Sequence, residues 1–435
     1  MNECWSSDHP ISRCPDHPIF PFIDPHKTRM LTLKVRHGSS GDSVPWSPST
    51  KRKSSLSSTS ETQTLRKTAL NALHRRLGAK MVDFGGWDMP VEYPSAGGLM
   101  REHVAVRTGV GMFDVSHMGD ILIRGPEALK ATQWISMNDA SKLQEGQAQY
   151  SALLYPEGTF VDDVIVHKLG NNDYLLVINA GTREKDYGWV KKNVSRFHCH
   201  ADDVGDYYTQ IAIQGPKAQA TLQKLTDVDL SQIKNYWFKY GTVCGLPNTM
   251  IARTGYTAED GFEIYVSSDV ATSERVWNEV TDAGREFGIV PCGLGARNTL
   301  RLEGRMALYG HEISDTINVW EAGLDRFCKM EKPDFIGRGA LEQAKAAGLK
   351  RTLVGLEAVE RGIPRDGYKV LDDGGAEIGY VTSGSYAPFL KKNIALAYVP
   401  PSHSELGHEV SVEIRGQKVK CKVVPTPFYK RPKKA

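Results

Sequence analysis

The sequence has no apolar run long enough to cross a membrane. A spanning helix needs about 18 or more consecutive apolar residues, and no such stretch occurs in the 435 residues. The chain also carries little net charge, formally +3 at pH 7, so it has no overall attraction to a polyanion. We therefore expect no membrane association and no nucleic-acid partner.

Cysteine is sparse and dispersed. None of the seven cysteines forms a C-x-x-C pair, which is typical of reduced thiols in an intracellular protein. The only local cluster of metal-ligand types is His-Cys-His at residues 198–200. Adjacent residues of a strand point to opposite sides, and no second ligand pair is present. We interpret these residues as a solvated turn and expect no metal.

The usual cofactor and catalytic motifs are also missing. The chain has no G-x-G-x-x-G after a strand, no G-x-x-x-x-G-K-[ST], no H-E-x-x-H and no G-x-S-x-G. Flavin, nicotinamide and nucleotide cofactors therefore lack their common binding loops. We expect neither a flavin nor a nicotinamide cofactor.

Composition divides the chain into three regions. Residues 1–61 are rich in Pro, His and Ser without helix or strand periodicity, which predicts a disordered extension. A targeting leader is the alternative, but this stretch has acidic residues and no apolar segment. Residues 62–345 mix helices and strands in an α+β pattern. From residue 346 onward short strands alternate with turns, which predicts an all-β domain, a small barrel.

The predicted elements follow from periodicity and turn signals. We expect helices at residues 68–77, 99–108, 128–135, 218–225, 274–287 and 340–347. We expect strands at residues 121–123, 164–166, 174–178, 211–213, 262–266, 369–371, 377–381, 394–399, 409–414 and 419–424. Asp373-Gly374 predicts a hairpin between the strands on either side of it.

One sequence pattern occurs twice. Residues 121–129 (ILIRGPEAL) resemble residues 211–219 (IAIQGPKAQ). Each copy reads as a strand, a Gly-Pro hinge and an amphipathic helix, because Pro presets the backbone of a first helical turn. The spacing of about 90 residues favours a duplicated α+β unit over a solenoid. Two independent uses of the same hinge are the alternative.

Two polar segments contain candidate functional acids. Residues 111–119 (GMFDVSHMG) place Asp114, Ser116 and His117 at an expected helix-to-strand junction, where they serve either as caps or as a site. Residues 158–163 open a strand. We interpret Asp162 as a turn residue and Asp163, at the strand mouth, as a candidate functional acid.

A third segment, residues 253–263, delivers a carboxylate into an apolar strand. Glu263 lies between Phe262 and Ile264, and a carboxylate buried there needs hydrogen-bond donors. A planar ligand edge with neighbouring N–H and amino groups would supply two. The alternative is an internal ion pair with Arg253 or Arg297.

Two more segments complete the candidates. In residues 293–303, Arg297 and Arg301 are four residues apart and share one face of an expected helix. Such a face could bind an anion, pair with an acidic side chain, or simply be exposed to solvent. Residues 381–388 (VTSGSYAP) form either a loop over a cleft or an ordinary hairpin connection.

These segments together resemble the glycine cleavage system T-protein family. The resemblance covers residues 62–430, with the family's motifs in order. It rests on residues 78–90 (GAKMVDFGGWDMP), 111–118, 253–263, 293–297 (GLGAR) and the stretch 382–399.

The resemblance implies a fold and an activity. The fold would be two interleaved α+β folate-binding subdomains around a central cavity, followed by a C-terminal β-barrel. The activity would be aminomethyl transfer from the lipoyl arm of the H-protein to tetrahydrofolate, giving methylenetetrahydrofolate and ammonia. The location would be the cytoplasm of a bacterium or the mitochondrial matrix of a eukaryote.

The resemblance also implies site residues. Asp163 matches the catalytic aspartate, and Glu263 matches the carboxylate that binds the pterin edge. The positions that match other folate contacts are Tyr150, Asn179, Tyr256, Arg297 and Met118. Two departures from the family pattern are Ala258, where Gly is usual, and Glu312, where Asp is common. An Ala at position 258 constrains the turn if its φ is positive.

Three other functions compete with this interpretation. A folate-dependent demethylase would use the same pterin site with a small methylated donor. A non-catalytic folate-binding module would carry a K-G-C-Y-x-G-Q-E signature, which is absent here. A flavin-linked oxidase subunit would need a nucleotide-binding domain, and no motif for one is present.

Overall fold

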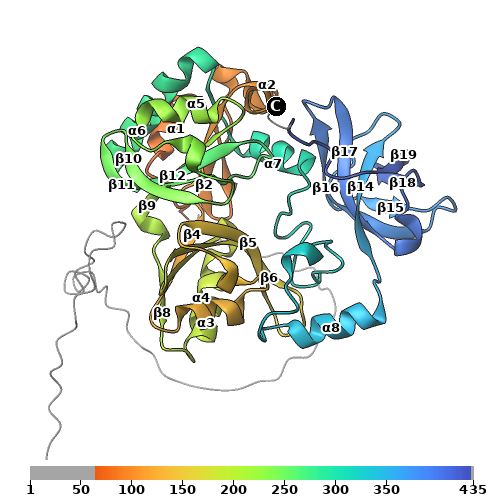
Figure 1. The fold of residues 1–435 in the computed structure, drawn as a ribbon. Coiled ribbons are helices and arrows are strands. Elements are labelled where there is room, and N and C mark those ends of the chain that lie inside the picture. Colours follow the sequence, from red (N-terminus) through yellow and green to blue (C-terminus); the bar gives the residue numbers. More distant parts are fainter. Residues whose placement is uncertain (1–63, 433–435) are drawn as a thin grey trace, which may run out of the picture. The chain divides into compact units, whose positions relative to one another are not determined.

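The computed structural model describes residues 64–432, and the described chain from Leu65 onward forms one compact unit (Figure 1). The expected extension, residues 1–61, lies outside the described residues. The helices are α1 (Asn71–Arg76), α2 (Gly98–Thr108), α3 (Ala128–Ile135), α4 (Arg183–Val194), α5 (Ala218–Leu222), α6 (Val270–Gly284), α7 (Leu294–Glu303) and α8 (Arg338–Ala347).

A six-stranded sheet has the order β10-β11-β12-β9-β3-β13. Its strands are β3 (Gly111–Asp114), β9 (Tyr208–Gln214), β10 (Phe238–Val243), β11 (Leu246–Ala252), β12 (Gly261–Ser267) and β13 (Val290–Pro291). All neighbours are antiparallel except β13, which runs parallel to β3. Helices α5 and α6 pack against β12, and their apolar faces join one core cluster with this sheet.

A five-stranded antiparallel sheet has the order β5-β6-β7-β4-β8. Its strands are β4 (Gly119–Arg124), β5 (Gln147–Leu154), β6 (Phe160–Gly170), β7 (Asp173–Ile178) and β8 (His200–Asp203). Helices α3 and α4 cover one face of this sheet and share a second core cluster with it.

The two sheets are interleaved along the chain. Strand β3 belongs to the six-stranded sheet and the next strand, β4, to the five-stranded one. The chain returns to the first sheet only at β9. Residues 111–119 were expected at a helix-to-strand junction, but they form β3, the turn at residues 115–118 and the start of β4, because β3 already begins at Gly111.

The repeated sequence pattern is a repeated structure. β4 leads through Gly125 to α3, and β9 leads through Gly215 to α5. Both glycines have positive φ, 140° and 127°, and a Cβ would lie 2.7 Å and 2.5 Å from backbone atoms. Each helix is followed by a short 3-10 turn capped by an aspartate, Asp139 and Asp229. The shared helix, turn and cap favour a duplicated unit over two independent hinges.

The C-terminal strands form a closed barrel in the order β14-β17-β16-β15-β18-β19, which confirms the predicted small barrel. They are β14 (Thr352–Ala358), β15 (Lys369–Leu371), β16 (Glu377–Ala387), β17 (Lys392–Val399), β18 (Glu409–Ile414) and β19 (Gln417–Val424). The hairpin predicted at Asp373-Gly374 joins β15 to β16. Residues 381–388 are neither a loop over a cleft nor a connection, because β16 runs on to Ala387 and pairs with β17.

Two further observations bear on the predictions. Within residues 64–432, no helix combines the length and apolar character that a membrane span requires. The five cysteines of this part of the chain are all free thiols, as predicted. The domain limits 62–345 and 346–435 remain our proposal.

Candidate functional site

A cavity of about 210 Å³ lies between the two sheets, on the faces that their helices do not cover. Strand alternation supplies its polar lining. On β12, Phe262 and Ile264 pack into the helix-side core, while Glu263 and Tyr265 line the cavity. On β6, Val166 joins the helix-side core. The cavity residues of that strand include Asp163, Ile165 and His167.

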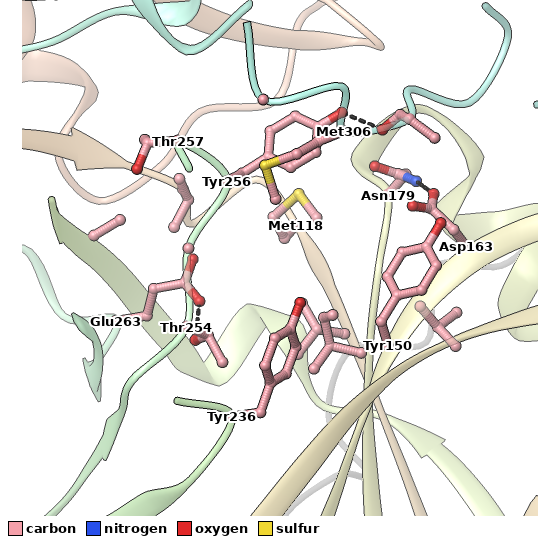
Figure 2. A pocket seen from close by; sticks show the side chains of 18 of the residues that line it. Met118, Tyr150, Asp163, Asn179, Tyr236, Thr254, Tyr256, Thr257, Glu263 and Met306 are labelled. Atoms are coloured by element: carbon pink, nitrogen blue, oxygen red, sulfur yellow. Dashed lines mark hydrogen bonds between the residues drawn. The ribbon is translucent and has the colours of Figure 1, made fainter. Parts of the chain in front are cut away.

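Glu263 lies on one side of this cavity (Figure 2). Its carboxylate accepts a hydrogen bond from the Thr254 hydroxyl, and burial raises the pKa of Glu263. The proposed ion pair does not form. Arg253 pairs with Asp260 at 2.6 Å, and no ion pair within residues 64–432 includes Glu263. The carboxylate thus retains acceptor capacity that faces the cavity.

Asp163 lies on the other side of the cavity (Figure 2). Its Oδ1 accepts from Nδ2 of Asn179 at 2.8 Å, and the Tyr150 hydroxyl points toward it from β5. Burial, together with the neighbouring charge of Asp162, raises the pKa of Asp163 to about 7. An acid with such a pKa carries a substantial anionic fraction at neutral pH while remaining largely desolvated.

The wall between these acids is formed by three predicted site residues. The Arg297 guanidinium stacks on the Tyr256 ring with its carbon 4.5 Å from the ring centre, and its Nη2 lies 3.9 Å from the sulfur of Met118. The Tyr256 hydroxyl donates to the Ala307 carbonyl. All seven residues that the resemblance implied therefore line one cavity; their roles remain predictions.

A second cavity, of about 280 Å³, borders the same wall. Tyr256 and Arg297 line both cavities. The second one extends between the hairpin of β1 (Lys80–Phe84) and β2 (Trp87–Glu92), helix α7 and the barrel strand β16. Its lining is mainly apolar on the hairpin side, with Val82, Phe84 and Val91.

Arg301 is part of a structural ion pair and does not reach the first cavity. Its Nη1 lies 2.7 Å from Oε2 of Glu312, and both side chains are buried. Glu312 also accepts from Thr382 of the barrel, at 2.6 Å, and Arg301 donates to Ser383 at 2.8 Å. The two arginines were expected to bind an anion, to pair with an acidic side chain or to face solvent. For Arg301 the second alternative is correct. The network joins α7 to the barrel.

The other predicted acids have structural roles. Asp114 accepts from the Ser116 N–H at 2.9 Å and pairs with the buried His74 at 2.9 Å. These contacts close the turn between β3 and β4, where no helix begins or ends, so the helix-capping interpretation is wrong for Asp114 and Ser116. Asp162 is not a turn residue. It lies inside β6, fully buried, because β6 begins at Phe160, before the expected start.

Several lining residues were not predicted. Tyr236 extends into the cavity from a backbone with φ of 60°, and no sequence signal marks it. His167 follows Asp163 by four residues on one strand face, so alternation along β6 would have identified it. Arg305 and Arg326 line the cavity from the segment between α7 and the barrel, which has no strand or helix periodicity.

Known proteins match this chain over most of its length. The GCVT N-terminal domain matches residues 70–332, and the glycine cleavage T-protein C-terminal barrel domain matches residues 351–430. The aminomethyltransferase of Koribacter versatilis is 73% identical over 371 residues, which are 85% of this chain and 98% of that protein. The aminomethyltransferase of Acidobacterium capsulatum is 70% identical over 378 residues, 87% and 99% of the two chains.

A solved structure matches as well. The crystal structure of glycine cleavage system aminomethyltransferase T from Bartonella henselae has a TM-score of 0.79 and 32% identity, covering 84% of this chain and 99% of that one. Because it is 73% and 70% identical to two aminomethyltransferases over the aligned residues, this chain is an enzyme of that class. It belongs to the glycine cleavage T-protein family, because both domain models of that family match it in consecutive segments. The resemblance and the predicted α+β fold are thereby confirmed.

Proposed function

We propose that the cavity between the sheets binds tetrahydrofolate and that the chain transfers to it the one-carbon unit of the aminomethyl-lipoyl H-protein. The single observation that carries this proposal is the pairing of Glu263 and Asp163 in one cavity. One carboxylate is free to hold a heterocycle edge, while the other faces the space where that heterocycle's reactive nitrogens would lie.

Glu263 would bind the pterin. A reduced pterin presents a ring N–H beside an amino group, and a carboxylate accepts both hydrogen bonds at once. The Thr254 hydroxyl already holds one oxygen of Glu263 in place. The absence of an internal ion pair for Glu263 among the described residues supports a ligand as its missing partner.

Asp163 would stabilise the migrating carbon. The C–S bond breaks with its electrons leaving on sulfur, and the carbon becomes an iminium-like cation. A folate nitrogen attacks this carbon. The second folate nitrogen then displaces ammonia as the ring closes, and the two folate N–H protons end on the thiolate and the departing amine. A nearby carboxylate lowers the energy of the developing positive charge, which fits a pKa of about 7 for Asp163.

Most of the acceleration would come from positioning. Holding the folate nitrogens and the aminomethyl carbon in contact supplies up to about 7–11 kcal/mol. The second cavity, which shares Tyr256 and Arg297 with the first, supports the approach of a second substrate from the barrel side. We infer that the H-protein presents its lipoyl arm there, and that the reaction takes place in the bacterial cytoplasm, since the matching relatives are bacterial.

The test is ammonia release from aminomethylated H-protein with and without tetrahydrofolate. We expect release that depends on both substrates, with methylenetetrahydrofolate formed in equal amount. Turnover of a small methylated donor without any lipoyl carrier would overturn the assignment of the donor and favour a demethylase.

A further inference from the structure

Asp162 is a fully buried carboxylate directly behind the proposed catalytic acid. It accepts four hydrogen bonds. Its Oδ1 receives the Asp163 N–H at 2.9 Å and Nδ2 of Asn179 at 2.8 Å. Its Oδ2 receives the Asn179 N–H at 3.2 Å and the Thr182 hydroxyl at 2.8 Å. Three of the four donors belong to Asp163 or Asn179, which both line the folate cavity.

These contacts determine the orientation of the Asn179 amide. Its Nδ2 donates to Asp162 and to Asp163, each at 2.8 Å. An ionised carboxylate only accepts, so a flipped amide would place its oxygen against two other oxygens. The amide oxygen must therefore face away from both acids. Figure 2 shows the Asn179 nitrogen directed at Asp163 and the oxygen on the opposite side.

We propose that Asp162 is a positioning residue for aminomethyl transfer, acting through Asn179. It holds the amide so that Nδ2 fixes the Asp163 carboxylate and the amide oxygen is presented to the cavity as an acceptor for a folate N–H. The proposal rests on the proposed catalytic role of Asp163. Asp162 itself contacts neither substrate.

Titratable groups face Asp162 from α4 and from the segment that follows α7. On α4, Nζ of Lys185 lies 3.3 Å from Asp186, and burial together with the neighbouring Asp162 raises the pKa of Asp186. Nζ of Lys185 also donates to the Tyr309 hydroxyl at 3.1 Å, and Tyr309 faces Asp162 from the other segment. Tyr150 lies next to Asp163.

The experiment is a double-mutant cycle on kcat for ammonia release from aminomethylated H-protein. The variants are Asp162→Asn, Asn179→Ala and the double variant, with Asp163→Asn as the reference for the catalytic acid. Because misplacing a reacting group by about 1 Å costs about 10²-fold, we expect each single variant to lower kcat about 10- to 100-fold. For Asp162→Asn the Kd for tetrahydrofolate should change less than about fivefold, since Glu263 still holds the ring and Asp162 contacts no substrate.

Non-additivity distinguishes positioning from folding. If Asp162 acts through Asn179, the double variant has the kcat of Asn179→Ala within about threefold. If Asp162 only stabilises the fold, the two losses multiply, or the melting temperature falls while kcat is unchanged, and either result overturns the proposal. Wild-type kcat for Asp163→Asn would instead refute the parent assignment of Asp163.

A matched control and a second variant complete the test. Glu102→Gln replaces an equally buried carboxylate, which accepts from the N–H groups of Tyr93 and Gly293 and lines neither cavity, and it should keep kcat within about threefold. If Asp162→Asn does not fold, Thr182→Val removes one donor to Asp162 and keeps every charge. Thr182→Val alone should lower kcat about two- to fivefold. When it is combined with Asn179→Ala, it should cause no further loss of kcat, and a further loss would overturn the proposal.

Discussion

The substitution Glu263→Gln tests the pterin site directly. It preserves the size and shape of the side chain and removes its charge. In the free enzyme Glu263 accepts from Thr254 and has no ion pair among residues 64–432, so the fold should tolerate a neutral amide. The effect should fall on the ligand, because the amide has one acceptor oxygen where the carboxylate has two.

The magnitude follows from the lost hydrogen bonds. A hydrogen bond to a charged group contributes about 1.5–3 kcal/mol, and the amide also places a donor against a ligand donor. We expect a loss of about 2–4 kcal/mol in binding, which is about 30- to 700-fold in Kd. The pKa of Glu263 is raised in the free enzyme by burial. Folate donors would lower it again, so binding should release protons and weaken as the pH falls through this pKa.

Calorimetry with tetrahydrofolate in two buffers of different ionisation enthalpy measures both the Kd and the number of protons released on binding. The matched control is Glu259→Gln, four residues earlier, where the carboxylate pairs with Arg107 at 3.0 Å and does not line the cavity. We expect its Kd to stay within about threefold of wild type. A folded Glu263→Gln variant with unchanged Kd and unchanged proton release would refute the assignment of Glu263.

Three other predictions follow from the same structure. Transfer needs the ionised Asp163 carboxylate, whose pKa is about 7, so kcat/KM should rise with pH to a plateau above about pH 7. For the same reason Asp163→Asn should lower kcat about 100-fold and leave the Kd for tetrahydrofolate unchanged. Ala258 has a φ of 62°, so Ala258→Gly should relieve about 1–2 kcal/mol of backbone strain in the folded protein. The added glycine also gives the unfolded chain more entropy, which costs about 0.4–1 kcal/mol of stability. The net effect should be a slightly higher melting temperature. Glu312→Ala leaves Arg301 buried without its partner and should cost about 3–5 kcal/mol, seen as a lower denaturation midpoint.

Much of the fold could be predicted from the sequence. The helix expected at residues 128–135 and the strands expected at residues 369–371, 409–414 and within β12 occur as predicted. Their periodicity reflects burial of one face, which is a local property of the sequence. The condition stated for Ala258 also holds, because its φ is 62° and the Ala therefore constrains the turn.

The functions of single polar residues were harder to predict. Asp114 and Asp163 both lie in strands that are otherwise rich in apolar residues. One is sequestered by His74, Thr68 and Ser116, whereas the other lines the cavity. Arg297 and Arg301 share one helix, and only the position of Glu312 determines which of them is neutralised. In each case the decisive partner lies outside the local periodic pattern, at His74 for Asp114 and at Glu312 for Arg301.

The sequence by itself determined the helices and strands with clear periodicity, the barrel and the family, because local periodicity and long motifs can be recognised without knowledge of contacts. Helix α4 and several strands, among them β1, β2, β5 and β14, were not predicted. Only the tertiary structure decided that β12 and β6 face each other across one cavity, and that Asp162 and Asn179 hold Asp163 there. The physical reason is that hydrogen bonds and burial depend on residues brought together by the interleaved sheets. The spacing of residues along the sequence does not reveal these distances.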